Sequence, residues 1–126
     1  MKKYLAVALI VLLAAGGVIA AQLTPYSVVS AVKTADALIY TVPSGRSVLF
    51  DGIVVQTDGT NDITFDIHDN TSAAGTKIIP TSLKVKGTSE TFALSYDPPV
   101  KCGTGIYVNL TTSGTVAYVV LYRVGE

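Results

Sequence analysis

Histidine, cysteine and tryptophan are almost absent from this chain. Its 126 residues include one His, one Cys and no Trp. A single cysteine excludes an intrachain disulfide framework and a thiolate zinc site, and a single histidine excludes the common two- and three-histidine metal centres. Because so few groups remain for acid–base, nucleophilic or metal chemistry, the sequence predicts a protein that is not an enzyme and needs no cofactor.

The chain also lacks an excess of charge of either sign. Nine Lys and Arg balance nine Asp and Glu, and charged residues make up only 14% of the chain. Binding to nucleic acid requires a basic surface that displaces counterions from phosphates. The composition therefore argues against nucleic acid as a partner, and the length is that of one domain.

Hydrophobic residues are concentrated near the N-terminus. Residues 4–21 carry no charge and follow Lys2 and Lys3. When this segment and Met1 are set aside, 45 of the remaining 105 residues are apolar, which is ordinary for a globular domain. The residues expected to lie in lipid, should the segment span a membrane, are Leu5, Val7, Leu9, Ile10, Val11, Leu12, Leu13, Val18 and Ile19.

Two interpretations of residues 1–21 remain open. One is a secretory signal peptide that is cleaved after Ala20, which yields an exported extracellular or periplasmic protein. The other is a retained membrane-anchor helix, since 18 residues at about 1.5 Å each nearly span a hydrocarbon core of about 30 Å. In both, the lysines keep the N-terminus in the cytoplasm and the rest of the chain lies outside.

From residue 22 onward the composition favours β-strands. Val, Ile and Thr make up 36 of these 105 residues, and β-branched side chains suit pleated surfaces. Alternation is clearest over residues 62–68, where Ile63, Phe65 and Ile67 are expected to face the core. The same alternation occurs in residues 83–86, in residues 91–96 with Phe92, Leu94 and Tyr96 inward, and in residues 106–111.

Two segments are apolar on both faces. Residues 48–55 are interrupted only by Asp51 and Gly52, which predicts a bulge or bend. Residues 116–124 are almost continuously apolar. Such strands lie centrally in a sheet or are covered on their second face by another sheet or another subunit.

The spacing of turn residues sets the fold class. Seven to eight short strands, with no convincing helix after residue 21, predict an all-β chain: one antiparallel β-sandwich of the jelly-roll type after an N-terminal hydrophobic helix. An immunoglobulin-type sandwich is the alternative, although its Cys–Trp–Cys core is missing.

The chain is expected to divide into three parts. Residues 1–21 are the signal peptide or anchor, residues 22–36 are a linker or contain a first strand at 26–32, and residues 37–126 form the sandwich. Turns are expected at 43–45, 58–61, 69–75, 87–88, 97–99, 103–105 and 112–114.

Acidic residues beside the one histidine are weak candidates for a metal site. Asp66 and His68 would share one strand face, where a metal ion or a general base is conceivable. The commoner structure for such a pair is a solvated strand end that runs into a turn. We expect the solvated strand end.

Two turns contain further candidate ligands. Asp58 and Asp62 crowd one turn with Asn61, and Asp69 begins another with Asn70. Calcium binds carboxylate and carbonyl oxygens in such loops, but Asp and Asn also build turns by bonding their own backbone. The spacing is not that of the usual calcium loop, so these residues are expected to shape turns.

The cysteine and the tyrosines are the remaining groups of interest. Cys102 has no evident activating base and is expected to be a buried or partly buried structural thiol. Tyr107 should face away from its apolar neighbours Ile106 and Val108, and aromatic rings stack on sugars or anchor interfaces. The candidate interface or binding residues are Tyr107, Tyr118, Tyr122, Val119 and Leu121.

Two stretches carry a resemblance to a known group of proteins. They are Ile63–Ile79, which holds the strand ending Asp69-Asn70 and a Ser/Ala/Gly loop, and Gly103–Leu110, which is followed by a Val- and Tyr-rich last strand. Together they resemble small β-sandwich proteins of bacteriophage virions, over about residues 37–123. The resemblance implies a structural subunit and brings no catalytic residues.

Two functions follow as hypotheses. The first is a structural virion protein, a capsid or vertex-type subunit that assembles with itself or with other virion or surface proteins and is tied to a lipid membrane if residues 1–21 are retained. A retained helix would suit a phage with an internal membrane. The alternative is a surface-exposed module of a phage or bacterium that binds glycans or a receptor through Tyr107 and loop Asp and Asn residues.

Overall fold

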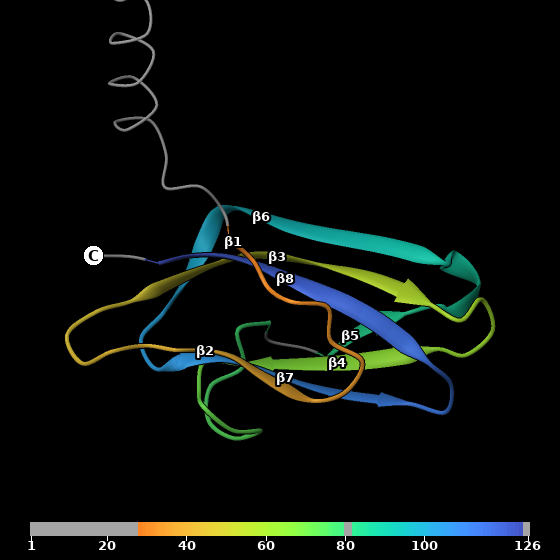
Figure 1. Cartoon of the computed structure of the whole chain (residues 1–126), viewed down its shortest axis with the longest axis horizontal. Coiled ribbons are helices and arrows are strands. Elements are labelled where there is room, and N and C mark those ends of the chain that lie inside the picture. Colours follow the sequence, from red (N-terminus) through yellow and green to blue (C-terminus); the bar gives the residue numbers. More distant parts are fainter. Residues whose placement is uncertain (1–27, 80–81, 125–126) are drawn as a thin grey trace, which may run out of the picture.

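Two four-stranded antiparallel sheets pack face to face in the computed structural model, which describes residues 28–79 and 82–124 (Figure 1). The all-β prediction is confirmed for these residues. The hydrophobic segment 4–21 and its expected helix lie outside them. The strands are β1 Val28–Val29, β2 Ala37–Thr41, β3 Val48–Thr57, β4 Ile63–His68, β5 Leu83–Val85, β6 Thr91–Cys102, β7 Gly105–Thr112 and β8 Val116–Val124, with a short 3-10 helix, η1, at Gly87–Ser89.

The strand order follows a simple pairing rule. The first sheet has the order β1-β8-β3-β6 and the second β2-β7-β4-β5. Each early strand pairs with its mirror from the other end of the chain: β1 with β8, β2 with β7, β3 with β6 and β4 with β5. The chain therefore follows the path of one long antiparallel hairpin that rolls over on itself into two layers.

The core lies between the two sheets and matches the expected alternation. Ile63, Phe65 and Ile67 of β4 are fully buried, as predicted. On β6, the inward side chains Phe92, Leu94 and Tyr96 are only half-buried. The other fully buried large side chains are Tyr118, Phe50, Ile53, Ile106, Val48, Val55, Val85, Val108 and Val120.

The predicted bulge at Asp51 and Gly52 is present. The register of β3 shifts between Phe50 and Gly52 against both of its neighbours, β6 and β8. A Cβ atom at Gly52 would lie 2.1 Å from the backbone carbonyl oxygen of Leu94, so only glycine permits this close approach. Glycine at this bulge thus lets β6 approach the central strand β3 closely.

The prediction of a turn at residues 97–99 is wrong. Strand β6 continues from Thr91 to Cys102, and Pro98 and Pro99 lie within it. A proline has no N–H to donate, but β6 is at the edge of its sheet, where one side of the strand needs no ladder partner. The prolines fall in the irregular stretch between the Ser95–Gly52 and Val100–Phe50 pairs.

Within residues 28–79 and 82–124, none of the helices has the length and apolar character needed to cross a membrane.

Candidate functional site

The carboxylate of Asp58 holds two loops together. Its oxygens accept hydrogen bonds from the backbone N–H groups of Thr60 (2.9 Å), Asn61 (2.8 Å) and Thr115 (3.2 Å), and from the Asn61 side chain (2.7 Å). The bonds from Asn61, backbone and then side chain, are the main reason why the pKa of Asp58 lies well below its usual range. Asp58 thereby joins the β3–β4 loop to the β7–β8 loop.

Asp62 and Asp66 have comparable structural roles. Asp62 accepts bonds from the backbone N–H of Gly87 (2.9 Å) and from Lys86 Nζ (3.1 Å), and these bonds, Gly87 first, lower its pKa. Asp66 accepts bonds from Lys77 Nζ (2.8 Å) and the Ser82 hydroxyl (2.6 Å), and Lys77 is the main cause of its lowered pKa. Both carboxylates therefore attach neighbouring loop segments to β4.

Asp69 binds three consecutive backbone N–H groups of a single turn. Its carboxylate accepts the backbone N–H groups of Gly103 (3.0 Å), Thr104 (2.8 Å) and Gly105 (3.2 Å), which form the tight β6–β7 turn. Burial raises the pKa of Asp69, but the three hydrogen bonds together outweigh burial, and the pKa is lowered overall. Asp69, which lies 34 positions before Gly103 in the chain, thus stabilises this turn.

The acidic metal candidates are therefore engaged with the protein's own donors. Among residues 28–79 and 82–124, no three His, Cys, Asp or Glu side chains are grouped so that they could hold a metal ion. The pair Asp66 and His68 shares a strand face as expected, but Lys77 and Ser82 bond the carboxylate. These turns are built from Asp and Asn bonding to backbone, the alternative that the sequence left open.

The expectation that His68 lies at a solvated strand end is wrong. His68 is only 6% exposed. The segment after β4 folds back over it, because the N–H of Ile78 donates to the carbonyl of Ile67 and the N–H of Asp69 donates to that of Thr76. The signal for this fold-back was in the sequence: Ile78 and Ile79, both buried, are an apolar pair that anchors the returning loop.

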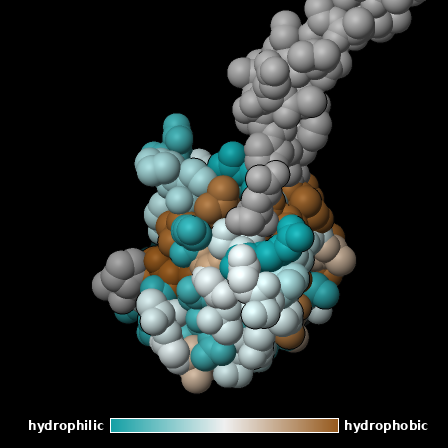
Figure 2. Space-filling view, turned by 90° about the vertical axis from the view of Figure 1, so that its left-hand side faces the viewer, coloured by the Kyte–Doolittle hydropathy of each residue, from teal (hydrophilic) through white to brown (hydrophobic). Residues whose placement is uncertain are grey.

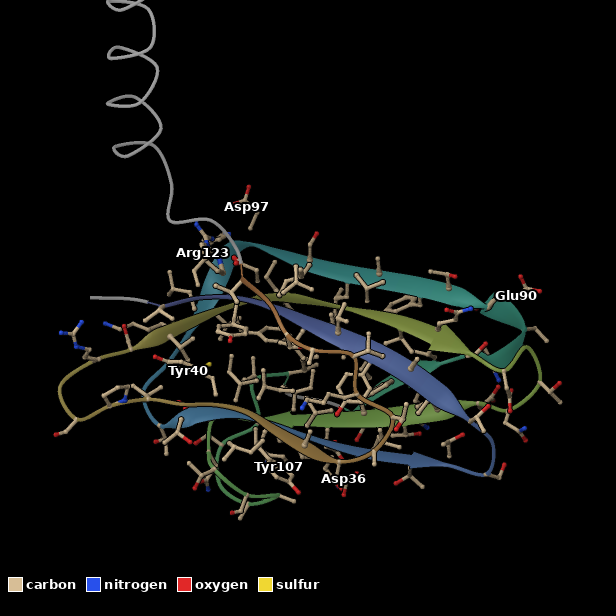
Figure 3. All side chains as sticks on the ribbon, in the orientation of Figure 1. Asp36, Tyr40, Glu90, Asp97, Tyr107 and Arg123 are labelled. Carbon is tan, nitrogen blue, oxygen red and sulfur yellow. The ribbon has the colours of Figure 1, made fainter. Side chains whose placement is uncertain are left out.

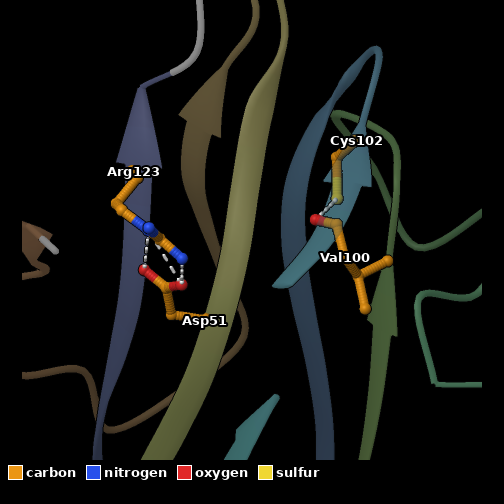
Figure 4. Close-up of polar contacts among 4 residues, drawn as sticks. All are labelled: Asp51, Val100, Cys102 and Arg123. Atoms are coloured by element: carbon orange, nitrogen blue, oxygen red, sulfur yellow. Dashed lines mark hydrogen bonds and ion pairs between the residues drawn. The ribbon is translucent and has the colours of Figure 1, made fainter. Parts of the chain in front are cut away.

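Cys102 is a buried thiol, as predicted. Its Sγ lies 3.7 Å from the carbonyl oxygen of Val100 (Figure 4), and the side chain is buried. Burial, and secondarily the negative charge of Asp69, raises the pKa of the Cys102 thiol to about 12. The group is therefore protonated at neutral pH and is a poor nucleophile.

Two of the tyrosines predicted to lie at an interface are on the inward side of β8, and one of them, Tyr118, belongs to the interior. Tyr118 is 2% exposed, donates its hydroxyl to the carbonyl of Ala35 (2.6 Å) and meets Phe65 edge-on at 5.4 Å between ring centroids. Tyr122 is half-buried and packs on Tyr40, also at 5.4 Å. Both side chains pack inward because they occupy the side of β8 that faces the second sheet.

Tyr107 lies on the outside of the second sheet. It is half-buried on β7, between its cross-strand neighbours Leu38 of β2 and His68 of β4. Figure 3 shows it on the layer remote from β6 and β3. Part of its ring is therefore accessible, but the loop carboxylates that a glycan site would need already accept hydrogen bonds from backbone N–H groups and from lysines.

Val119 and Leu121 lie on the opposite side of β8, on a surface that we call the outer apolar face. Cross-strand pairs there are Val119 with Val54, Val54 with Ala93, and Leu121 with Val29. Hydrophobic side chains gather on the upper part of the end view in Figure 2, where this sheet lies. The outer apolar face comprises Val29, Val32, Val54, Ala93, Ala117, Val119 and Leu121.

The outer apolar face is shallowly hollowed, and an ion pair lies at one end of it. A hollow of about 210 Å³ is lined by Val32, Val54 and Val119, among others. At the far end of β8, Arg123 Nη2 meets Asp51 Oδ1 at 2.6 Å, and Arg123 Nε bonds both carboxylate oxygens at 3.0 Å (Figure 4). This bidentate pair leaves little net charge beside an apolar surface.

Comparison of the chain with protein-family models, curated proteins and solved structures finds no match.

Proposed function

We propose that this chain is a non-enzymatic structural protein of a virion, a capsid or vertex-type subunit that acts by assembling with copies of itself or with other virion proteins. The observation that carries the proposal is the outer apolar face. Val29 and Val32 on this face are 58% and 67% exposed. Contiguous exposed apolar surface usually marks a site of protein or membrane contact.

The path of the chain supports the same proposal. Strands that pair first with last, second with second-last and so on, in two layers, are expected of a jelly roll, an architecture used by viral capsid and lectin domains. The fold does not determine the function, so this support is an analogy. It agrees with the resemblance of residues 63–79 and 103–110 to phage virion proteins.

The chemistry of the carboxylates supports a structural rather than a binding or catalytic role. Asp58, Asp62, Asp66 and Asp69 each bond groups of the domain itself. Such an arrangement rigidifies the loops at the ends of the sandwich. A rigid subunit suits assembly, because less conformational entropy is lost when its surfaces are buried.

Residues 1–21 decide where such a subunit would act. Retention of the hydrophobic segment would anchor the domain in a lipid membrane of the virion. Cleavage would release an exported domain. Mass measurement of the protein taken from its native assembly distinguishes the two, since a cleaved chain lacks about twenty residues.

Immunogold electron microscopy tests the proposal. Antibodies against the domain are expected to label particles released by cells that carry the gene. Full-length protein with Val119→Lys and Leu121→Lys is expected to fold but to be lost from those particles, since two charges cannot be buried in an apolar contact without partners. A matched control carries Asn109→Lys and Thr111→Lys, two outward positions of β7 on the other sheet.

Protein found only in fractions free of particles would contradict the proposal, as would equal incorporation of the two double variants.

The alternative, a surface module that binds glycans or a receptor, rests on the accessible part of Tyr107. It predicts glycan-array binding that a Tyr107→Ala variant loses while the Val119 and Leu121 variant keeps it.

A further inference from the structure

The four edge strands of the sandwich are protected to different degrees. An edge strand presents unpaired N–H and C=O groups, and proteins guard such strands with short length, charge, proline or bulges. Strand β1 has two residues, and β5 has three with Lys84 among them. Strand β2 has an irregular register between Leu38 and Tyr40.

Strand β6 is the exception, because half of it has none of these devices. It is 12 residues long, and among the described residues its ladder partner is β3 alone. Residues 97–101 contain Asp97, Pro98, Pro99 and Lys101, all protective. Residues 91–96, the open edge, have no charge and no proline and pair with β3 without a break from Thr91 to Ser95. Figure 3 shows this segment between the labelled Glu90 and Asp97.

The inward side chains of the open edge are also incompletely covered. Phe92, Leu94 and Tyr96 point toward the second sheet but are only half-buried. The strand at the corresponding edge of that sheet, β5, has three residues and is too short to cover all of them. The open edge thus combines unpaired backbone groups with a partly exposed apolar row.

The sequence of the open edge complements itself in one antiparallel register. With Leu94 opposite Leu94 of a second copy, Phe92 lies opposite Tyr96 and Ala93 opposite Ser95, so inward residues meet inward residues. Aromatic side chains directly opposite each other stabilise a strand pair, and small residues meet on the outer side. No like charges face each other between residues 91 and 97.

We infer that the open edge of β6 pairs with the same edge of a second copy of this chain, about a two-fold axis at Leu94, so that the two first sheets join into one eight-stranded sheet. The interface is isologous, as in most homodimers. The rotation axis is perpendicular to the sheet, which leaves both outer apolar faces on the same side. This inference rests on the proposed function in that it specifies one contact of the assembling subunit. The contact is made through the strand edge, which shares only Ala93 with the outer apolar face.

Disulfide cross-linking of the full-length protein tests the register. Directly opposite residues in an antiparallel pair have Cα atoms about 4.5–5.5 Å apart, within the range that a disulfide bridges. Leu94→Cys is therefore expected to give a dimer of twice the 13.1 kDa chain mass, less any cleaved leader, on a non-reducing gel. Thr91→Cys is the matched control on the same strand. It is more exposed, but its two copies would be roughly 20 Å apart.

A pair of charge variants tests the contact without cysteine. Ala93 and Ser95 are exposed in the single chain, so lysines there should leave folding unchanged. Ala93→Lys with Ser95→Lys places like charges opposite each other twice, and loss of the dimer is expected in size-exclusion chromatography with light scattering. Ala93→Lys with Ser95→Glu places opposite charges there and is expected to keep the dimer.

Three outcomes would overturn the inference: Thr91→Cys cross-linking as well as Leu94→Cys, a dimer that survives the double lysine variant, or loss of the dimer in both charge variants. Failure here is distinguishable from failure of the proposed function. Particles that are labelled by antibody while Leu94→Cys stays monomeric would reject the edge contact only. A cross-linked dimer that never reaches a particle would reject the virion role only.

Discussion

Single carboxylates fasten the loops at the ends of this sandwich. Asp69 is the clearest example, because its one carboxylate accepts hydrogen bonds from three consecutive N–H groups of a tight turn. Hydrogen bonds to a charged acceptor are worth more than neutral ones. Acidic residues at loop positions are thus explained by the donors of the chain itself.

Asp69→Asn is expected to lower the free energy of unfolding by about 2–3 kcal/mol, because an amide offers one acceptor oxygen where three N–H groups converge. Urea denaturation followed by circular dichroism measures the change. Asp97→Asn, on an exposed part of β6, is the control and should change stability by less than about 0.5 kcal/mol. Equal effects in the two variants would refute the assigned role of Asp69.

The Cys102 thiol is expected to resist alkylation and Ellman's reagent at pH 8 while the protein is folded. A pKa of about 12 leaves only about one thiolate in 10⁴ at that pH, and burial also blocks access. Reaction should become fast and stoichiometric in concentrated guanidinium. Rapid reaction of the native protein would show that the thiol is not buried as described.

At the scale of the elements, the central strand of the first sheet contains a β-bulge that shapes its pairing with both neighbours. Strand β3 pairs on both sides and carries the bulge at Asp51 and Gly52 where both registers shift. The bulge places Asp51 beside Arg123 of β8, and the two form the bidentate ion pair. A strand that is apolar on both faces can thus accommodate one charged residue next to its partner.

Gly52→Ala is expected to destabilise the domain by about 2–3 kcal/mol or more, since the new methyl group overlaps the Leu94 carbonyl and the β3–β6 pair must move apart. Thermal unfolding by calorimetry measures the loss. Gly103→Ala is the matched control, because a Cβ there has no heavy atom within 4 Å. A Gly52→Ala protein as stable as Gly103→Ala would mean that β6 is not held close to the bulge.

At the scale of the whole molecule, the carboxylates make stability depend on acid. The pKa values of Asp58, Asp62, Asp66 and Asp69 are all lowered in the folded protein. A group with a depressed pKa stabilises the fold fully above its unfolded value, near 3.9, and loses that contribution as the pH falls through the folded value. Each of these carboxylates therefore contributes stability that is lost in acid.

Stability is therefore expected to be nearly constant from about pH 7 to pH 5 and to fall steeply below about pH 4. Urea midpoints measured across this range test the expectation. The Asp69→Asn variant should show a shallower acid slope, by up to about 1.4 kcal/mol per pH unit, because it takes up one proton fewer on unfolding. A midpoint that rises on acidification would contradict the lowered pKa values.

The strands and their inward faces could be predicted because local sequence determines them. The alternation in β4 and β7 and the bulge of β3 follow from side-chain period and glycine. The position of Pro98 and Pro99 could not be predicted, since a proline pair reads as a turn until the strand is known to be an edge. The burial of Tyr118 could not be predicted either, because β8 is apolar on both faces and local sequence does not show which face meets the second sheet.

The sequence by itself determined the all-β class, the strand periodicity and the scarcity of histidine and cysteine, because these depend on composition and on neighbours along the chain. Tertiary structure alone decided what the polar groups do. It brought Asp69 to a turn 34 residues away, folded a loop over His68, and left β6 at an edge with half of its length unguarded. Each feature depends on which distant segments of the chain lie side by side, and no local sequence pattern encodes that.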